Sequence, residues 1–234
     1  MDPRHDRIDT PPRERLFNAP LLAVLVAVSM PVLYVFQSGA VDQWISLAFV
    51  PTDLERGRWG GLVSSMLLHG NWPHVLMNSI AALTFGAPVA RLLRGPAGIG
   101  AFFTLYIVSG VVGAAGYGLL HLDSSAPLVG ASGAIFGLIG AATRLIGVPG
   151  QSPGGRVMPL TARPVVTASI AWMAVNAVIG LIGLAPGADG ARIAWEAHAF
   201  GFLTGLLLIG PLARLFGTPG PGFDSRDVMG DPRS

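Results

Sequence analysis

Six apolar runs separated by short polar breaks divide the chain, and they constrain its fold more than any other feature. Each run has about 20 residues, close to the length that an α-helix needs to cross a hydrocarbon core of about 30 Å. Because a backbone in lipid must satisfy its own hydrogen bonds, we expect each run to be helical. The sequence therefore predicts an all-α membrane protein, a bundle of six transmembrane helices at residues 17–36, 73–92, 97–120, 129–147, 164–184 and 194–216.

The composition excludes several other classes of protein. Hydrophobic residues make up 51% of the 234 residues and charged residues only 12%, and the mean hydropathy is +0.58, values too apolar for a soluble domain of this length. The absence of cysteine excludes disulfides, thiolate metal sites and a cysteine nucleophile. The net charge is only +2, and the arginines are scattered among the loops, so we expect no nucleic-acid partner.

The arginines also predict an orientation. Six spans place both termini on one side of the membrane. With the N-terminus in the cytoplasm, twelve of the fifteen arginines lie inside and only Arg56, Arg58 and Arg192 lie outside, which satisfies the positive-inside rule. We expect a multi-pass protein of the cell membrane, with a membrane domain at residues 17–216 and disordered cytoplasmic tails at 1–16 and 217–234.

The connection at residues 37–71 is longer than a turn and carries several apolar residues, among them Trp44, Phe49 and Trp59. One interpretation is a loop that lies on or in the outer leaflet of the membrane. The other is an ordinary extracellular loop that buries its apolar residues, and the composition favours neither.

Ser132 stands at the head of the fourth run, in a series of glycines spaced three and four residues apart: Gly130, Gly133, Gly137 and Gly140. The sixteen residues from Ser132 to Gly147 would span roughly 24 Å as a helix, less than the core of about 30 Å. The helix would therefore start below the outer surface, where irregular backbone is tolerated only inside protein or beside water. We expect a water-filled cavity above Ser132. For Ser132 alone, simple helix packing is the alternative.

Three other polar side chains share this predicted depth. His74 and Asn78, spaced i, i+4, lie on one face at the outer end of the second run, and His198 lies at the outer end of the sixth. Gly201 and Gly205 share the stripe of His198 and form a surface of small residues that can meet the ridge of Gly133 and Gly137. If these surfaces dock, His198 comes close to Ser132. Polar groups inside a membrane are expensive and point to function.

A serine and a histidine in contact can act as nucleophile and base. The acid of a triad is missing, since Glu196, two residues from His198, projects from the opposite side of its helix, so the sequence predicts a dyad. His74, Asn78 and the N–H of Ser132 suit a site that binds an oxyanion. As alternatives, His198 and Asn78 could be packing residues, or His69, His74, His198 and Glu196 could bind metal. The spacing His-Glu-x-x-His is absent, so we expect neither metal nor cofactor.

Three motifs, in this order and on the second, fourth and sixth runs, resemble those of the rhomboid family of intramembrane serine proteases. They are His69-Gly-Asn-Trp-Pro-His74-Val-Leu-Met-Asn78, Gly130-Ala-Ser132-Gly133 and Ala197-His198-Ala-Phe-Gly201-Phe-Leu-Thr-Gly205. The resemblance implies that Ser132 attacks the peptide carbonyl, that His198 is the base, and that His74, Asn78 and the Gly130–Ser132 segment bind the oxyanion and substrate. His69, Gly133, Gly201 and Gly205 would have supporting roles, His69 as a structural or hydrogen-bonding residue.

The resemblance further implies that the partners are transmembrane protein substrates within the bilayer, that the site opens to the extracytoplasmic side, and that the fifth span with residues 185–193 is a mobile gate. Many family members carry a Trp-Arg pair where this chain has Gly60 and Gly61, so the fixing of the first loop is an open question. Two other functions stay open: a non-catalytic rhomboid-like chaperone that binds transmembrane clients, and a small-solute transporter. The sequence leaves the oligomeric state open.

Overall fold

The computed structural model describes residues 19–145, 157–183 and 194–217 of the protein. Both predicted tails, residues 1–16 and 217–234, lie outside these ranges apart from Gly217, and so does the predicted gate loop at 185–193. Within the described ranges the chain forms helices and no β-strand. Two isolated β-bridges join Phe49 to Leu128 and Leu93 to Gly217.

Five helices among the described residues are long and apolar enough to cross a membrane. They are α1 (Leu21–Ser38), α4 (Trp72–Leu92), α5 (Gly95–Leu120), α7 (Arg163–Ile182) and α8 (Trp195–Phe216). Many of their large apolar side chains point outward, such as Leu25 on α1 and Ile170 on α7, which is the surface expected of helices in contact with lipid. The prediction of an all-helical membrane bundle is confirmed, and the protein is a multi-pass membrane protein.

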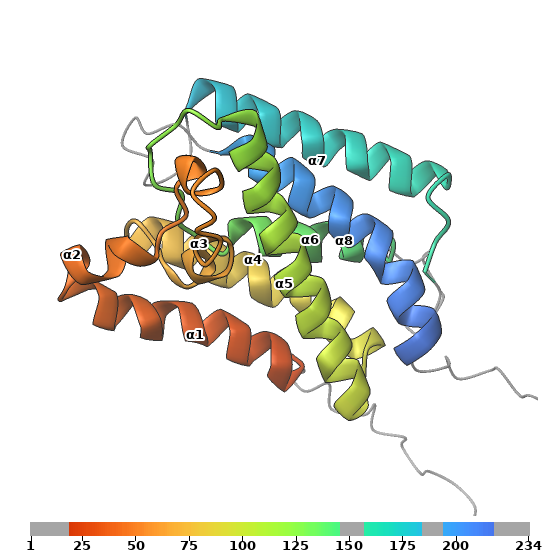
Figure 1. Ribbon diagram of the computed structural model, residues 1–234. Helices are drawn as coiled ribbons and strands as arrows, with labels where there is room; N and C mark the ends of the chain where they lie inside the picture. The colour runs from red at the N-terminus through yellow and green to blue at the C-terminus, as the bar shows by residue number, and fades with distance from the viewer. Residues whose placement is uncertain (1–18, 146–156, 184–193, 218–234) are drawn as a thin grey trace, which may run out of the picture.

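The predicted count of six spans is not exact, because the fourth apolar run forms a helix even shorter than the sixteen residues that the sequence predicts. Helix α6 (Ser132–Thr143) has 12 residues, or about 18 Å at 1.5 Å per residue. It ends because the N–H groups of Arg144 and Leu145 bond the carbonyls three residues earlier, of Ala141 and Ala142, in a tight turn. Ten of its 12 residues are buried, and it packs against α4, α5, α7 and α8, inside the bundle (Figure 1). Protein therefore encloses this helix on all sides.

Glycines on α6 and α8 allow these two helices to pack backbone against backbone. A Cβ atom at Gly201 would overlap the carbonyl oxygen of Gly133, and one at Gly205 would overlap the carbonyl oxygen of Gly137. The two ridges that the sequence predicts to dock thus lie in register, one glycine against another in successive turns. Such a contact is typical of small-residue surfaces in membrane bundles, where close packing replaces the hydrophobic effect.

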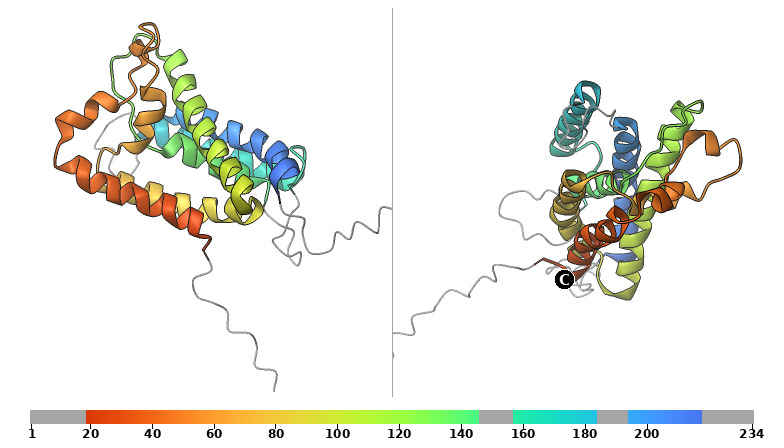
Figure 2. Two further views of the ribbon diagram at one scale, coloured as in Figure 1. Left: turned by 60° about the horizontal axis from the view of Figure 1, so that its bottom comes forward. Right: turned by 90° about the vertical axis from the view of Figure 1, so that its left-hand side faces the viewer.

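The segment between α1 and α4 folds into short helical turns that stand beside α5 (Figure 2). Its elements are α2 (Val41–Trp44), η1 (Ile45–Leu47), η2 (Pro51–Asp53), α3 (Gly61–Ser64) and η3 (Ser65–Leu67). Phe49 is fully buried and exchanges two backbone hydrogen bonds with Leu128, of 3.1 and 2.7 Å, whereas Trp59 is 65% exposed. The segment therefore anchors on the bundle and also presents apolar side chains outward, as a loop in contact with a leaflet would.

Candidate active site

The backbone just before α6 has a conformation that only glycine adopts easily. Gly130 has a φ of +125°, and a Cβ atom there would lie 2.8 Å from Cε1 of His74. The Gly130 N–H donates to the carbonyl of Ser65 at 2.9 Å, so the first loop holds this turn in place. Glycine is needed here both for the positive φ and for the close approach of the His74 ring. Ser132, two residues after Gly130, is the first residue of α6 and is half-buried.

Helix α4 supplies the two polar side chains next to this turn. Asn71 caps the helix, its side-chain oxygen accepting a hydrogen bond from the His74 N–H at 3.0 Å, so that His74 lies in the first turn. Asn78 lies one turn further on and is 6% exposed. Its Nδ2 has no hydrogen-bond partner among the described residues. A buried amide donor without a partner is unusual and costs about 1–3 kcal/mol.

The contact between α6 and α8 brings the predicted nucleophile and base together. His198 precedes Gly201 by one turn on α8, and its Nε2 lies 2.8 Å from Oγ of Ser132. Its ring stacks on that of Phe136, one turn into α6, with 4.3 Å between ring centroids and 4° between planes. Helix α6 thus provides the hydroxyl and also the flat surface that orients the imidazole. Both Ser132 and His198 keep partial exposure.

A third side chain completes this arrangement, and the sequence analysis missed it. Asn176 on α7 directs Oδ1 to Nδ1 of His198 at 2.9 Å. The third member of a triad is expected to be a carboxylate, so an amide on the fifth span was not predicted. The signal was present, because Asn176 is the one amide or ionisable side chain within residues 164–184. The rule that intramembrane polar groups point to function applies to it as to Asn78.

The remaining polar side chains around the site do not form a metal centre. Glu196 lies on another side of α8 and contacts Nε2 of His121, on the loop after α5, at 3.3 Å. Within the described ranges, no three His, Cys, Asp or Glu side chains form a group that could hold a metal ion. The chemistry available here is that of a hydroxyl, an imidazole and amide donors.

Comparison with known proteins shows which family this sequence belongs to. The model of the Rhomboid domain matches residues 56–215, more than half of the chain and all four helices that carry the site. The chain belongs to the rhomboid family. Its membership supports intramembrane proteolysis as the activity at the level of the family.

Curated rhomboid relatives match shorter stretches. RHOMBOID-like protein 9, chloroplastic, of Arabidopsis thaliana is 38% identical over 114 residues, 49% of this chain and 22% of the relative. Rhomboid protease GluP of Bacillus subtilis (strain 168) is 33% identical over 88 residues, 38% of this chain and 16% of the relative. RHOMBOID-like protein 4 of Arabidopsis thaliana is 34% identical over 147 residues, 63% of this chain and 32% of the relative. The matched stretches thus span a third or less of these relatives.

The departure of this rhomboid chain has a structural reason at Gly61, whereas a Cβ atom at Gly60 would meet open space. A Cβ atom at Gly61 would lie 2.8 Å from the Cα of Phe49 and 2.9 Å from the carbonyl oxygen of Ala48. Any side chain at position 61 would push apart two backbone segments of the first loop. The loop is fixed instead by the Phe49–Leu128 bridge and by Gln37, whose side-chain amide bonds both the N–H and the carbonyl of His69, at 3.0 and 2.6 Å.

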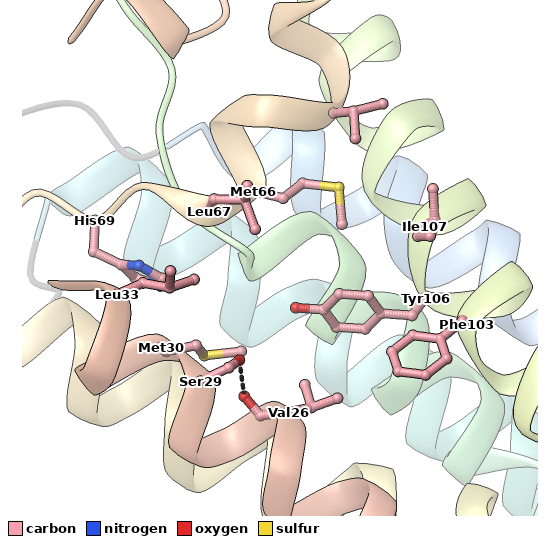
Figure 3. Close-up of a pocket in the computed structure, with 11 residues that line it drawn as sticks. Val26, Ser29, Met30, Leu33, Met66, Leu67, His69, Phe103, Tyr106 and Ile107 are labelled. Atoms are coloured by element: carbon pink, nitrogen blue, oxygen red, sulfur yellow. Dashed lines mark hydrogen bonds between the residues drawn. The ribbon is translucent and has the colours of Figure 1, made fainter. Parts of the chain in front are cut away.

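His69 lies between the site and an apolar cavity. Its ring packs edge-on against that of His74, with 5.2 Å between centroids, and neither ring nitrogen has a hydrogen-bond partner among the described residues. Burial, and to a smaller extent His74, lowers the pKa of His69 to about 4, so the ring is neutral at physiological pH. On its other side is a mostly apolar cavity of about 260 Å³ between α1, η3 and α5, toward which the Tyr106 hydroxyl points (Figure 3). The predicted water-filled cavity above Ser132 is a different space and stays a prediction.

Proposed function

We propose that this rhomboid-family protein is a serine endopeptidase that cleaves transmembrane segments of other membrane proteins with a dyad of Ser132 and His198. The observation that carries the proposal is the distance of 2.8 Å between Nε2 of His198 and Oγ of Ser132. A serine hydroxyl is a weak nucleophile until a base within hydrogen-bond reach accepts its proton. This pair meets that requirement, and both residues are partly exposed.

The reaction starts when Ser132 Oγ attacks the carbonyl carbon of the scissile peptide bond and His198 Nε2 accepts the hydroxyl proton. The tetrahedral intermediate then collapses, the C–N bond breaks, and the protonated His198 donates its proton to the leaving amine. Water attacks the remaining ester, His198 accepts a proton from that water, and the acid product leaves as Ser132 regains its proton. The same imidazole serves as base and as acid in both halves of the reaction.

The negative charge that develops on the substrate oxygen needs hydrogen-bond donors. The Ser132 N–H stands at the start of α6, where backbone N–H groups lack intrahelical partners and the helix dipole favours negative charge. His74 lies against Gly130, next to Ser132, and the Nδ2 of Asn78 has no partner among the described residues. We assign these three donors to the oxyanion, and removing one such donor typically costs on the order of a hundredfold in rate.

The partners follow from the location of the site. A transmembrane helix hides its carbonyls in hydrogen bonds, so segments that unwind easily should be cleaved first. The distribution of arginines supports a cell-membrane protein with its termini in the cytoplasm and its site near the extracytoplasmic surface.

Replacing Ser132 by Ala tests this function. In proteoliposomes, Ser132→Ala is expected to abolish cleavage of a reporter transmembrane segment and labelling by a fluorophosphonate, because the nucleophile is gone. In cells, the wild type should release the extracytoplasmic fragment of the reporter outside, and release into the cytoplasm would contradict the orientation.

Ser109→Ala is the matched control. Ser109 is a buried serine of α5 that packs against α6 at Gly137, and its Oγ has no hydrogen-bond partner among the described residues. This variant should cleave and be labelled like the wild type. Normal cleavage by Ser132→Ala would reject the proposal. A wild type that binds the reporter without cleavage or labelling would indicate the chaperone function. A wild type that transports solute without cleaving the reporter would indicate the transporter function.

A further inference from the structure

Asn176 is buried on a helix that is otherwise exposed. Of the 20 residues of α7, only Val165 and Asn176 are buried, and Asn176 is 5% exposed. One turn later, Gly180 lets Trp195 approach so closely that a Cβ atom at position 180 would overlap the Trp195 side chain. Helix α7 therefore meets the start of α8 at two successive turns, and the first of these contacts is polar.

The two hydrogen bonds of Asn176 determine which way its amide points. Nδ2 donates to the backbone carbonyl of Trp195 at 2.8 Å. A carbonyl oxygen can only accept, so the amide nitrogen must face it and the amide oxygen must face His198. Oδ1 then lies 2.9 Å from Nδ1 of His198. The backbone of α8 thus fixes the orientation of the side chain that contacts the imidazole.

This orientation fixes the tautomer of the imidazole in turn. Because Oδ1 of Asn176 is an acceptor, the neutral ring must carry its hydrogen on Nδ1. The lone pair is then on Nε2, which faces Ser132 Oγ at 2.8 Å. The hydrogen bonds run in one direction, from Ser132 to His198 to Asn176. In the opposite tautomer, Nε2 would carry the hydrogen and could not accept the proton of Ser132.

We propose that Asn176 is a positioning residue for the reaction: it holds His198 in the Nδ1–H tautomer and stabilises the imidazolium through a charge-assisted hydrogen bond once Ser132 has lost its proton. The inference rests on the proposed serine protease function. An amide suits this place in a membrane protein, since a carboxylate on α7 would be an expensive intramembrane charge. Asn and Asp are both used to orient histidine in proteases on other folds.

Two variants of Asn176 test this role by steady-state cleavage in liposomes between pH 5 and 9. Asn176→Ala is expected to lower kcat roughly 10- to 30-fold with little change in KM, because it removes one hydrogen bond to a group that is charged in the transition state. Asn176→Asp restores the acceptor and should regain most of the activity at high pH. The added carboxylate favours the protonated imidazole, so the acidic limb of the pH profile should move to higher pH.

Other groups around the imidazole set the background of that profile. His74 of α4 is the titratable group on that side, with its ring against Gly130. Phe136 and Ser132 of α6 are uncharged, and Glu196 of α8 is engaged by His121. None of these changes in the Asn176 variants. Ser169→Ala, two turns earlier on α7 at a buried Oγ without a partner in the described ranges, should match the wild type in kcat and in pH profile.

A measurement that needs no turnover separates this inference from the proposed function. Nitrogen-15 NMR of the histidine-labelled protein is expected to show His198 protonated at Nδ1 in the wild type and a mixture of tautomers in Asn176→Ala. A wild type that cleaves nothing would end the protease proposal, while the NMR would still test the tautomer. The inference would be overturned if Asn176→Ala had the wild-type kcat and pH profile. It would also be overturned if the Ala and Asp variants lost stability and activity equally, because Asn176 would then only hold α7 and α8 together.

Discussion

Helices α6 and α7 both contribute to the site, yet their environments are opposite. Ten of the 12 residues of α6 are buried, whereas α7 buries only two of 20. Helix α6 contains Ser132 and the ring that stacks on His198, while α7 contains a single amide in contact with His198. The proposed nucleophile thus lies on a helix held by protein on all sides, and a helix that mostly faces outward supplies a hydrogen bond to the proposed base.

This difference has an energetic cause. Between membrane helices no hydrophobic effect drives association, because lipid is as apolar as a side chain, so close packing and hydrogen bonds must hold them. Helix α6 obtains that packing through glycines that bring its backbone against α8. Helix α7 lacks such a ridge toward α6 and relies on Asn176 and Gly180 at its contact with α8. Substitutions in α6 should therefore affect folding, and substitutions in α7 mainly the reaction.

The largest effect is expected where the two backbones touch. Gly205→Ala would place a methyl group into the carbonyl oxygen of Gly137, and neither backbone can move without separating α6 from α8. Overpacking of a core typically costs about 1–3 kcal/mol, and a clash with backbone exceeds that range. We expect loss of more than about 3 kcal/mol of stability and of all cleavage activity, measured by thermal unfolding in detergent and by reporter cleavage.

Gly100→Ala is the matched control. Gly100 is a helical glycine of α5 whose would-be Cβ meets no atom beyond its own turn of helix within 4 Å. Gly100→Ala should keep the wild-type activity and a Tm equal to or slightly above that of the wild type. A Gly205→Ala variant as stable as Gly100→Ala would show that the α6–α8 contact is not the rigid part of the molecule.

A smaller effect is expected from cavities. Leu138 of α6 is fully buried, and Ile170 of α7 is 65% exposed. Leu138→Ala leaves a cavity inside the bundle and should lower the free energy of unfolding by about 2–3 kcal/mol. Ile170→Ala removes a side chain that faces outward and should change it by less than about 0.5 kcal/mol. If chemical unfolding showed equal losses of free energy in Leu138→Ala and Ile170→Ala, α7 would be packed as tightly as α6, and the contrast between the two helices would be wrong.

The glycine pattern was enough to predict which faces of α6 and α8 meet. Small residues at i and i+4 on two apolar helices have few other uses, and His198 stands on the same stripe as Gly201 and Gly205. The proximity of Ser132 and His198 follows from that docking. This part was predictable because periodicity within a helix is local information.

Other parts depended on contacts between distant segments, which a pattern cannot show. The early end of α6 involves Arg144, whose side chain bonds the carbonyls of Met158 and Leu206. The need for glycine at position 61 depends on the backbone of Phe49. Asn176 is a different case, because its polarity was visible but its orientation depends on the carbonyl of Trp195.

The smallest effect is expected at the stacked ring that orients the base from the α6 side. Phe136→Leu keeps most of the apolar volume but removes the flat surface parallel to the imidazole. Such an aromatic pair contributes about 0.5–1.5 kcal/mol, so kcat/KM should fall roughly two- to tenfold, with Tm within a few degrees of the wild type.

Phe85→Leu provides the comparison for that variant, because Phe85 of α4 also forms an aromatic pair, edge-on with Trp172 of α7 at 5.3 Å, but does not contact the imidazole. Phe85→Leu should lose about as much stability as Phe136→Leu but keep the wild-type kcat/KM. If Phe136→Leu lowered kcat/KM as far as Asn176→Ala lowers kcat, the stacking face and the amide would be equal partners in orienting His198. A smaller loss in Phe136→Leu would mean that one hydrogen bond from the exposed helix α7 contributes more to the orientation of His198 than the stacked ring of the buried helix α6 does.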